Sequence, residues 1–562
     1  MNESSLWIIL QRMRLPFVVI LVTYTVAMTG LLMIPGVDTN GNIYHMSIFD
    51  AFYFVTYTAT TIGFGELPFP FTHEQKIWVT MSIYFVVLGW FYSIGTLISL
   101  FQDKLFISEI AIAQFRRSVK NMKEDFVIIL GYNETTREIV RRMLAAEMRV
   151  VVIEINPERA EYLQLEGFVP TVPILVKNAH NPDALEDAGI KLKNCKGIIS
   201  LFEDNALNLR ITLASKLLNP YINVVVKSTT PEQTENLLDA GADIVDNPFM
   251  IMSYQLQMAL NAPSILKLER WLYQIDTLES KTFSIPNTNV LICGYGRLGS
   301  SLYKMFKRNH VNPTIIEIEK SKFDTAVYAG VENILHGNAD DQLYLETAHI
   351  REAELVIIAT DNDTTNLSIL STVKKMNSSA LIVARENEIT DFSIFSQAKI
   401  DHLYIPERIL IQKTTNSISH PLSDRLIGIL PNKDEAWGQK LLSKLIKTIG
   451  IDPLAFELNL KEKEAYEIYR YLEDADNTLN LGTLKLSRRD RNQTNNIVPL
   501  LIVRGEEELL LPDDTLELEI NDKILFACDE NAIEDLEYIA NNAYEFEYII
   551  SGKEKSFFFT SI

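Results

Sequence analysis

Residues 61–65 near the N-terminus have the composition of a loop that binds a cation through its backbone. Rings of backbone carbonyl oxygens can replace the water around K⁺, and glycines permit the unusual φ and ψ angles that aim successive carbonyls at one axis. The preceding segment, 48–60, has the pattern of a short helix leading into this loop. The predicted selectivity-filter residues are Thr61, Ile62, Gly63, Phe64 and Gly65.

A second motif with chemical meaning is the GxGxxG sequence of residues 294–299, which follows a short apolar strand and precedes a helical pattern. Such a turn lets a pyrophosphate approach the backbone at a helix N-terminus, where free N–H groups and the helix dipole favour an anion. Glu317 follows Gly294 by 23 residues, where a carboxylate can accept from ribose hydroxyls and repels a 2′-phosphate. NAD(H) or an adenine nucleotide such as ADP is therefore favoured over NADP. The predicted nucleotide-binding residues are Gly294, Tyr295, Gly296, Arg297, Leu298, Gly299, Glu317, Asn338, Ala339 and Asp361.

The strand, turn and helix pattern around the second motif occurs earlier in the chain as well. Residues 125–131 form an apolar strand that ends in a glycine, and Glu154 follows Gly131 by 23 residues, the same spacing as in the later copy. The repeat continues, with Asp204-Asn205 matched to Asp361-Asn362. Strands that alternate with helices at this spacing predict two parallel, Rossmann-like sheets.

The first copy lacks the second and third glycines of the turn. Asn133 places a side chain where backbone would meet phosphate, and Glu134 adds an opposing charge. Dinucleotide binding in the usual pose is therefore not expected here. A structural role and a smaller or differently placed ligand both remain open for this copy.

The elements around the filter loop have the character of membrane spans. Residues 15–34 and 78–101 carry no charge and are long enough to cross a hydrocarbon core of about 30 Å. Arg12 and Arg14 precede the first span, and 104–123 is rich in Lys and Arg, so both termini are predicted to be cytoplasmic. A cleaved signal peptide is the alternative for the first run, but it leaves the second run unexplained.

The second span suggests where a gate could lie. Gly89 could lower the cost of bending the helix, or it could serve close helix packing. Beyond it Ile94, Leu97 and Phe101 recur at helical spacing and are predicted to form a narrow inner mouth that excludes ions by dewetting.

Composition limits the possible partners. The chain has 562 residues and a formal net charge of −21, which argues against nucleic-acid binding. An acidic cytoplasmic part could enrich cations near a pore, although a solvated and soluble surface is the favoured explanation of the charge. Cys195, Cys293 and Cys528 are far apart and are expected to be reduced thiols.

Taken together, these motifs resemble those of prokaryotic RCK (regulator of K⁺ conductance) channels, whose cytoplasmic domains have the KTN/TrkA-type fold. Residues 61–65 resemble the potassium-channel signature, with Phe64 in place of the usual Tyr. The resemblance implies a homotetramer in membrane lipid, with paired RCK domains in a gating ring and a β-rich lobe that includes 496–537. In calcium-gated relatives carboxylates follow the strand corresponding to 224–226, whereas here Lys227-Ser228-Thr229 follow it. That Ca²⁺ site is not expected, and Asp204 and Asp243 leave other Ca²⁺ sites open.

The expected fold class is an α-helical two-span pore domain joined to α/β, with two Rossmann-like RCK domains and a β-rich C-terminal lobe. The expected domains are a pore in 1–107, a linker in 108–123, RCK1 in 124–265, a connector in 266–287, the RCK2 Rossmann-like lobe in 288–425 and the RCK2 C-terminal lobe in 426–562.

The expected function is that of a nucleotide-gated K⁺ channel in a prokaryotic inner membrane, with no enzymatic activity. Two alternatives are a less selective cation channel, given Phe64, and a nucleotide-sensing regulatory subunit of a K⁺ transporter. A membrane-tethered NAD-dependent oxidoreductase would need a positioned base, for which His336 and His349 are candidates by residue type alone.

Overall fold

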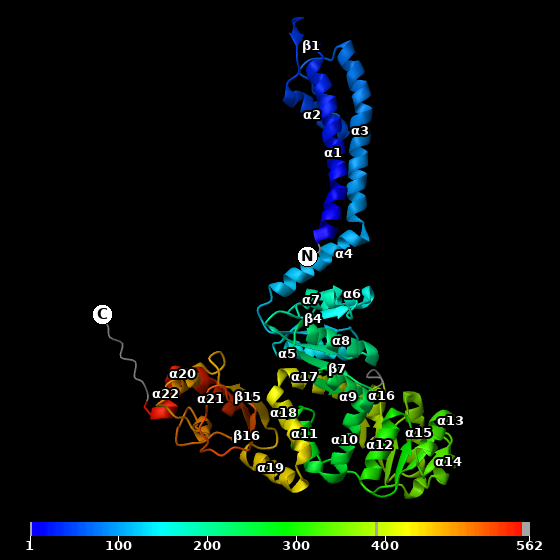
Figure 1. The fold of residues 1–562 in the computed structure, drawn as a ribbon, viewed down its shortest axis with the longest axis vertical. Coiled ribbons are helices and arrows are strands. Elements are labelled where there is room, and N and C mark those ends of the chain that lie inside the picture. The colour runs from blue at the N-terminus through cyan, green and yellow to red at the C-terminus, as the bar shows by residue number, and fades with distance from the viewer. Residues whose placement is uncertain (1–2, 388–391, 399, 554–562) are drawn as a thin grey trace. The chain divides into compact units, whose positions relative to one another are not determined.

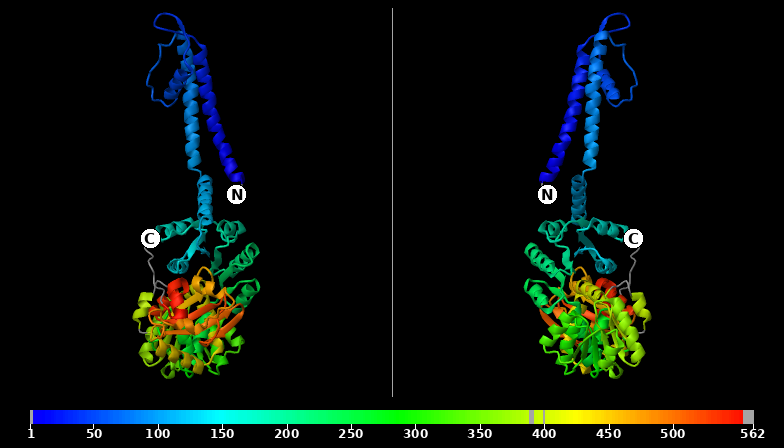
Figure 2. Two further views of the ribbon diagram at one scale, coloured as in Figure 1. Left: turned by 90° about the vertical axis from the view of Figure 1, so that its left-hand side faces the viewer. Right: turned by 90° about the vertical axis from the view of Figure 1, so that its right-hand side faces the viewer.

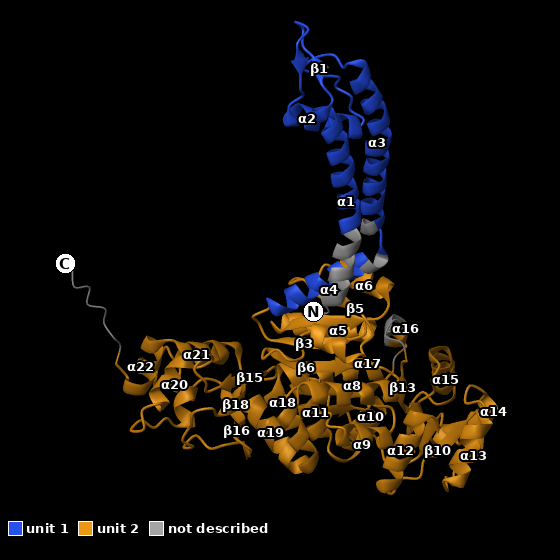
Figure 3. Ribbon diagram, turned by 45° about the horizontal axis from the view of Figure 1, so that its top comes forward, with its two compact units in different colours: residues 1–121 blue, residues 122–562 orange. Residues whose placement is uncertain are grey.

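The structure is a computed structural model that describes residues 3–387, 392–398 and 400–553. It divides into two compact units, Met1–Asn121 and Met122–Ile562 (Figure 3).

The first unit is built on two long helices. Helices α1 and α3 run side by side in opposite directions, and α2 packs against both (Figures 1 and 2). Within α1 and α3, segments Arg14–Met33 and His73–Ser99 are long and apolar enough to cross a membrane. The elements are α1 (Glu3–Met33), β1 (Gly36–Val37), β2 (Ile43–Tyr44), α2 (Ile48–Ala59), α3 (His73–Phe101) and α4 (Lys104–Lys120).

Small residues let α1 and α3 approach closely. A Cβ atom at Gly89 would lie 2.9 Å from the methyl carbon of Thr23, so a larger side chain would push the helices apart. Trp78 Nε1 donates to the carbonyl of Ala27 at 3.1 Å, and Ser93 Oγ donates to the carbonyl of Pro16 at 2.9 Å. Of the two interpretations of Gly89, this contact favours helix packing.

The second unit contains two six-stranded parallel sheets with the same doubly wound order, β5-β4-β3-β6-β7-β8 and β11-β10-β9-β12-β13-β14. Their inner strands are apolar and largely buried on both faces, as expected for parallel sheets covered by helices. The first sheet comprises β3 (Phe126–Leu130), β4 (Arg149–Glu154), β5 (Ile174–Val176), β6 (Cys195–Ser200), β7 (Asn223–Lys227) and β8 (Ile244–Asp246). The second comprises β9 (Val290–Cys293), β10 (Thr314–Glu317), β11 (Ile334–His336), β12 (Leu355–Ile358), β13 (Leu381–Arg385) and β14 (His402–Tyr404).

Helices cover both sheets and begin mostly at Asn, Asp, Thr or Pro, which cap or start helices. Around the first sheet lie α5 (Glu134–Ala145), α6 (Pro157–Leu165), α7 (Pro182–Asp187), α8 (Asn205–Leu218) and α9 (Pro231–Asp239). Around the second lie α12 (Arg297–Arg308), α13 (Lys320–Tyr328), α14 (Gln342–Thr347), η1 (Ile350–Glu352), α15 (Asp363–Met376) and α16 (Phe392–Gln397).

A pair of helices follows each sheet, and both helices of each pair have Pro at their first position. The four helices lie centrally in the second unit, and they contact both Rossmann-like copies and the C-terminal lobe (Figure 1). These helices are α10 (Pro248–Asn261), α11 (Pro263–Leu272), α17 (Pro406–Ser419) and α18 (Pro421–Ile429).

The C-terminal lobe is built on a four-stranded antiparallel sheet of order β15-β18-β16-β17. Its elements are η3 (Leu430–Asn432), α19 (Glu435–Thr448), β15 (Leu454–Asn459), α20 (Tyr466–Leu472), η4 (Leu481–Lys485), β16 (Ile497–Arg504), β17 (Glu507–Leu510), β18 (Lys523–Cys528), α21 (Glu530–Asn541) and α22 (Ala543–Ser551). The predicted fold class, two helical spans, two Rossmann-like sheets and a β-rich lobe, is confirmed.

Candidate functional site

The loop predicted to be a selectivity filter follows directly from α2. Ser47 caps α2, with its Oγ accepting from Asp50 N at 3.1 Å. After the helix, Thr61, Gly63 and Gly65 have φ angles of 60°, 64° and 72°. Left-handed residues thus alternate with Ile62 and Phe64, whose φ angles are not positive, a backbone in which successive carbonyl oxygens can face one side.

Two tyrosines of α2 brace the end of the filter loop. Tyr57 Oη donates to the carbonyl of Glu66 at 3.2 Å, and Tyr53 Oη donates to Glu66 Oε2 at 3.0 Å. The Phe64 ring meets the Tyr57 ring edge to face, with centroids 6.4 Å apart. Phe64 has no hydroxyl, and hydroxyls from α2 hold Glu66 instead. The sequence motif did not indicate Glu66, because the residue lies outside the five-residue pattern.

The predicted gate residues lie on α3. Ile94 and Leu97 are half-buried. A Cβ atom at Gly95 would meet nothing within 4 Å, so this position of α3 borders open space. The side chain of Phe101 lies outside the part of the chain that the structure describes. The gate therefore stays a prediction.

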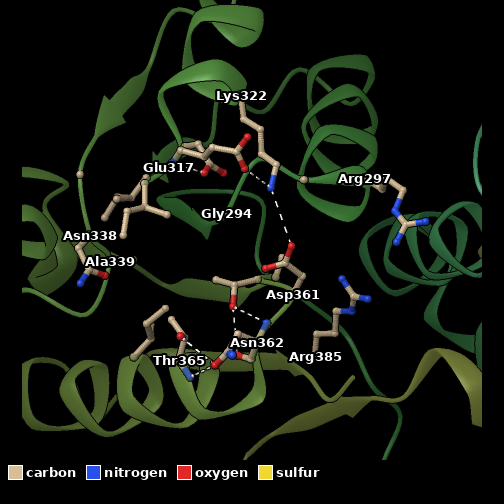
Figure 4. A pocket seen from close by; sticks show the side chains of 18 residues that line it. Gly294, Arg297, Glu317, Lys322, Asn338, Ala339, Asp361, Asn362, Thr365 and Arg385 are labelled. Carbon is tan, nitrogen blue, oxygen red and sulfur yellow. Dashed lines mark hydrogen bonds and ion pairs between the residues drawn. The ribbon is translucent and has the colours of Figure 1, made fainter. Parts of the chain in front are cut away.

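The predicted nucleotide-binding residues border a pocket of about 310 Å³ at the carboxyl end of the second sheet (Figure 4). The pocket opens between β9 and β12, where the strand order reverses, which is the place where open α/β sheets bind ligands. Seven predicted residues line it: Gly294, Gly296, Arg297, Glu317, Asn338, Ala339 and Asp361.

The glycine turn leaves the N-terminus of α12 open. Gly296 is the N-cap of α12 and makes no side-chain cap, and a Cβ at this position would meet nothing within 4 Å. Gly294 has a φ of 102°, a conformation that residues with a side chain rarely adopt. Gly299 is needed for packing, because a Cβ there would lie 2.0 Å from the carbonyl oxygen of Gly294. The first N–H groups of α12 are therefore available to an anion.

Three predicted residues do not line the pocket. Tyr295 and Leu298 are buried in the hydrophobic core, and Gly299 lies behind the turn. Their role is to hold the turn, and Tyr295 does so through its backbone.

Glu317 has a structural use that the sequence did not suggest. Its Oε2 accepts from Tyr295 N at 2.5 Å and its Oε1 accepts from Glu319 N at 2.7 Å, and the residue is 4% exposed. Glu154 does the same in the first copy, accepting from Tyr132 N at 2.6 Å and Asn156 N at 2.8 Å. The 23-residue spacing thus belongs to a brace present in both copies, and each carboxylate retains lone pairs for a further donor.

The pocket has an acidic end and a basic end. Lys322 Nζ lies 2.8 Å from Glu319 Oε2 and 3.9 Å from Asp361 Oδ2, and the Glu319 bond raises the pKa of Lys322. At the other end Arg297 and Arg385 point toward one another (Figure 4). Burial lowers the pKa of Arg385. A ribose diol suits the acidic end, and phosphates suit the arginines and the helix N-terminus.

Eleven lining residues were not predicted from the sequence: Ile316, Ile318, Glu319, Lys322, Gly337, Ala359, Thr360, Asn362, Thr365, Ile369 and Arg385. Arg385 could have been found from the rule that strand ends meet at one edge of a parallel sheet, because it closes β13.

In the first copy the equivalent helix N-terminus is closed. Asn133 Oδ1 accepts from Thr136 N at 2.9 Å, and Thr136 Oγ1 accepts from Asn133 N at 2.9 Å, which is a capping box. The Phe202 ring lies against Gly131, where a Cβ would be 2.9 Å from it. This geometry agrees with the expectation that the first turn does not hold a dinucleotide in the usual pose.

Matching hydrogen bonds define which residues correspond between the copies. Asn208 Nδ2 donates to the carbonyls of Phe202 and Lys227, and Asn366 Nδ2 donates to those of Thr360 and Arg385. Glu203 and Lys227 therefore stand where Asp361 and Arg385 stand in the second copy. The sequence-based match of Asp204 with Asp361 was wrong by one residue, because Asp204 caps α8 as Asn362 caps α15.

The carboxylates considered for Ca²⁺ have structural partners. Asp204 Oδ1 accepts from Ala206 N, and Asp243 Oδ2 binds Lys216 Nζ at 2.8 Å and Val224 N at 2.7 Å. Within the described residues, no group of three or more His, Cys, Asp or Glu side chains is placed to hold a metal ion. His336 and His349 are not among the residues that line the pocket.

Comparisons with known proteins agree with this geometry. The TrkA-N domain model matches residues 127–248 and 290–406, one segment for each Rossmann-like sheet. Potassium channel protein 1 of Methanocaldococcus jannaschii is 24% identical over 278 residues, which cover 49% of this chain and 79% of that protein. An uncharacterized protein of Methanothermus fervidus is 28% identical over 247 residues, which cover 44% of this chain and only 38% of that protein. The solved GsuK channel aligns with a TM-score of 0.50 and 15% identity, over 98% of this chain and 100% of that one.

The TrkA-N domain model thus matches both Rossmann-like copies, one after the other along the chain. The resemblance to prokaryotic RCK-type potassium channels is confirmed, and the fold of the chain is similar to that of the GsuK channel.

Proposed function

We propose that the chain is one subunit of a K⁺ channel whose RCK-type domains bind an adenine nucleotide and bias the opening of the pore. The alternating backbone at Thr61, Gly63 and Gly65, placed between two membrane-length helices, is the observation that carries the pore assignment. In this proposal the chain lies in a prokaryotic inner membrane with both termini cytoplasmic.

The proposed assembly is a homotetramer, and the filter geometry supports a ring of subunits. One loop supplies one side of a carbonyl cage, and a closed ring of identical subunits supplies the rest. The filter residues Ile62 and Phe64 are 61% and 64% exposed in the single chain, and the lipid-facing helices are likewise exposed, as a subunit of a ring requires.

The ligand assignment rests on the charge distribution of the pocket. Arg297, Arg385 and the open end of α12 supply positive charge for a diphosphate. The other end has three carboxylates and one amine, so the negative charge of a 2′-phosphate is disfavoured there. These groups belong to Glu317, Glu319, Asp361 and Lys322. NAD(H) or ADP fits this arrangement better than NADP does.

Ligand binding would act by differential affinity for two conformations of the cytoplasmic part. A tenfold change in the gating equilibrium needs only about 1.4 kcal/mol of differential binding. No catalytic step is part of the proposal, and Ca²⁺ enters only as a second ligand to be tested.

The test is single-channel recording of the purified chain in planar bilayers with opposed K⁺ and Na⁺ gradients. Openings that reverse at the K⁺ potential and change in probability with ADP, NAD⁺ or NADH are expected. A reversal potential between those of K⁺ and Na⁺ would indicate the less selective channel, and a chain without openings would indicate the regulatory subunit. Ca²⁺ is added last.

A variant separates the pocket from the pore. Gly296→Asn would place an amide over the N-terminus of α12 without a steric clash, and it is expected to abolish the nucleotide response while openings persist. Asn133→Asp, which keeps the equivalent cap of the first copy, is the matched control and should respond like the wild type.

A further inference from the structure

The two arginines of the pocket share an aromatic ring that belongs to the first copy. The guanidinium carbon of Arg297 lies 4.6 Å from the centroid of the Phe249 ring, and that of Arg385 lies 5.2 Å from it. Phe249 is 6% exposed and is the second residue of α10, the helix that follows the last strand of the first sheet. Such cation–π contacts are strongest where water is excluded.

The start of α10 is also held by the second sheet. Tyr404, at the end of β14, donates from its hydroxyl to the carbonyl of Pro248. Residues of the second copy thus hold the first turn of α10 from two sides, and α10 packs further along on α12 and α11.

Arg385 has a buried hydrogen-bond donor that is available to an anion. Its Nε atom is buried and has no hydrogen-bond partner among the described residues. Two guanidinium groups on one ring repel each other, and burial lowers the pKa of Arg385, with the charge of Arg297 adding to the effect. A phosphate between them would satisfy both donors.

The first copy supplies the carboxylate that now faces Arg297. Glu203 Oε2 lies 4.0 Å from Arg297 Nη1, and Glu203 Oε1 accepts a hydrogen bond from Lys227 Nζ. The side chains of Arg297 and Glu203 are 52% and 68% exposed, so this pair is weak and exchangeable. When Arg297 binds another anion instead of Glu203, Glu203 can retain its hydrogen bond from Lys227.

We propose a relay in which the first copy senses phosphate in the second pocket through Phe249 and Glu203. This inference rests on the proposed nucleotide site and names its regulation. Phosphate oxygens take Arg297 and Arg385, fix both guanidinium groups on the Phe249 ring, and release Glu203 to Lys227. The ligand class is a nucleotide with a diphosphate, since one pair of oxygens must meet two arginines and the end of α12.

The two residues have separable effects. Without the carboxylate of Glu203, phosphate no longer competes for Arg297, so Glu203→Gln should bind ADP about threefold to tenfold more tightly at low salt. Phe249→Leu keeps both arginines and the helix end, so its ADP affinity should change by less than about threefold. The ordering of α10 by ADP should then be lost.

The experiment uses the full chain in nanodiscs, with ADP as the probe. Calorimetry gives the affinity, and hydrogen exchange of residues 249–261 reports α10 independently of ion flux. In the wild type ADP is expected to slow exchange in this segment, and in Phe249→Leu it should bind without slowing it. Met252→Leu, a buried change on the same helix, is the control for Phe249, and Glu158→Gln, an exposed acid of the first copy, is the control for Glu203.

The possible outcomes are distinct. A Phe249→Leu chain whose α10 is protected by ADP as in the wild type overturns the relay and leaves the nucleotide site standing. Unchanged ADP affinity in Glu203→Gln overturns the part assigned to Glu203. A wild-type chain that binds no ADP overturns the proposed nucleotide site and the relay with it.

Discussion

The two Rossmann-like copies share their strand order and their carboxylate brace, and they differ in what occupies the helix end after the first strand. In the first copy Asn133 and Thr136 close the N-terminus of α5 with their own side chains. In the second, Gly296 and Gly299 leave the N-terminus of α12 open, and two arginines stand beside it. The same fold can therefore satisfy its helix end internally or offer it to a ligand.

The largest effect is expected at the third glycine position of the turn, where the second copy has Gly299 and the first copy has Thr136. In Gly299→Thr the new Cβ would lie 2.0 Å from the Gly294 carbonyl oxygen, so the variant should lose more than about 3 kcal/mol of stability. Thermal unfolding of the full chain measures this loss. The reverse change, Thr136→Gly, removes a cap and a small buried side chain but creates no clash, so it should cost less. Equal losses in the two variants would contradict the difference in packing.

A buried glutamate in the helix pair after the first copy predicts that stability depends on pH. Glu269 of α11 is 2% exposed, and burial raises its pKa to about 7, whereas the equivalent position of α18 is Ile427. The folded state holds this proton more tightly than the unfolded state does, so stability is greatest below the ordinary pKa of glutamate and falls as the pH rises toward 7. Glu269→Gln should remove roughly 2–3 kcal/mol of that fall.

Denaturant unfolding between pH 4.5 and 7.5 measures the difference. Asp424 and Glu457, whose pKa values burial raises to about 6 and about 7, will leave part of the slope in the variant. Glu158→Gln, at an exposed site, should keep the whole slope. A Glu269→Gln chain with the full slope would show that Glu269 is not the group that titrates.

A smaller effect is expected from the caps alone. Asn133→Ala removes the acceptor for Thr136 N and should cost about 1 kcal/mol. Gly296→Ala adds a methyl group in open space at an ordinary φ and should leave the stability almost unchanged. Thermal unfolding of both variants sharpens the comparison, and a larger loss from Gly296→Ala would reverse it.

The smallest difference is expected between the cysteines of the two copies. Burial raises the pKa of Cys195 in the first sheet and of Cys293 in the second to about 12. Both thiols should therefore react with iodoacetamide at pH 8 far more slowly than a free thiol, and at similar rates. Mass spectrometry of the native and the unfolded chain measures the ratio, and rapid labelling of one cysteine would mark its sheet as the less stable.

The sequence predicted the fold well where a local pattern has one physical meaning. Uncharged helices of membrane length, repeated apolar strands and glycine turns at fixed positions left few alternatives. The pocket was predicted less fully, because Lys322 and Arg385 come from elements that only the folded sheet brings to one edge. Glu317 was predicted as a ribose acceptor, and its brace to Tyr295 N could not be seen, since a backbone partner leaves no mark in the sequence.

The carboxylate brace of Glu317 also bears on the time course of the proposed regulation by nucleotide. The bonds from Tyr295 N and Glu319 N to Glu317 lie within the protein, so the shape of the glycine turn does not depend on an arriving nucleotide. A ligand that meets a prepared turn is expected to associate without the delay of a conformational change in that turn. How long a nucleotide stays bound would then be set by its dissociation rate, and substitutions at Arg297 or Arg385 would shorten this residence time.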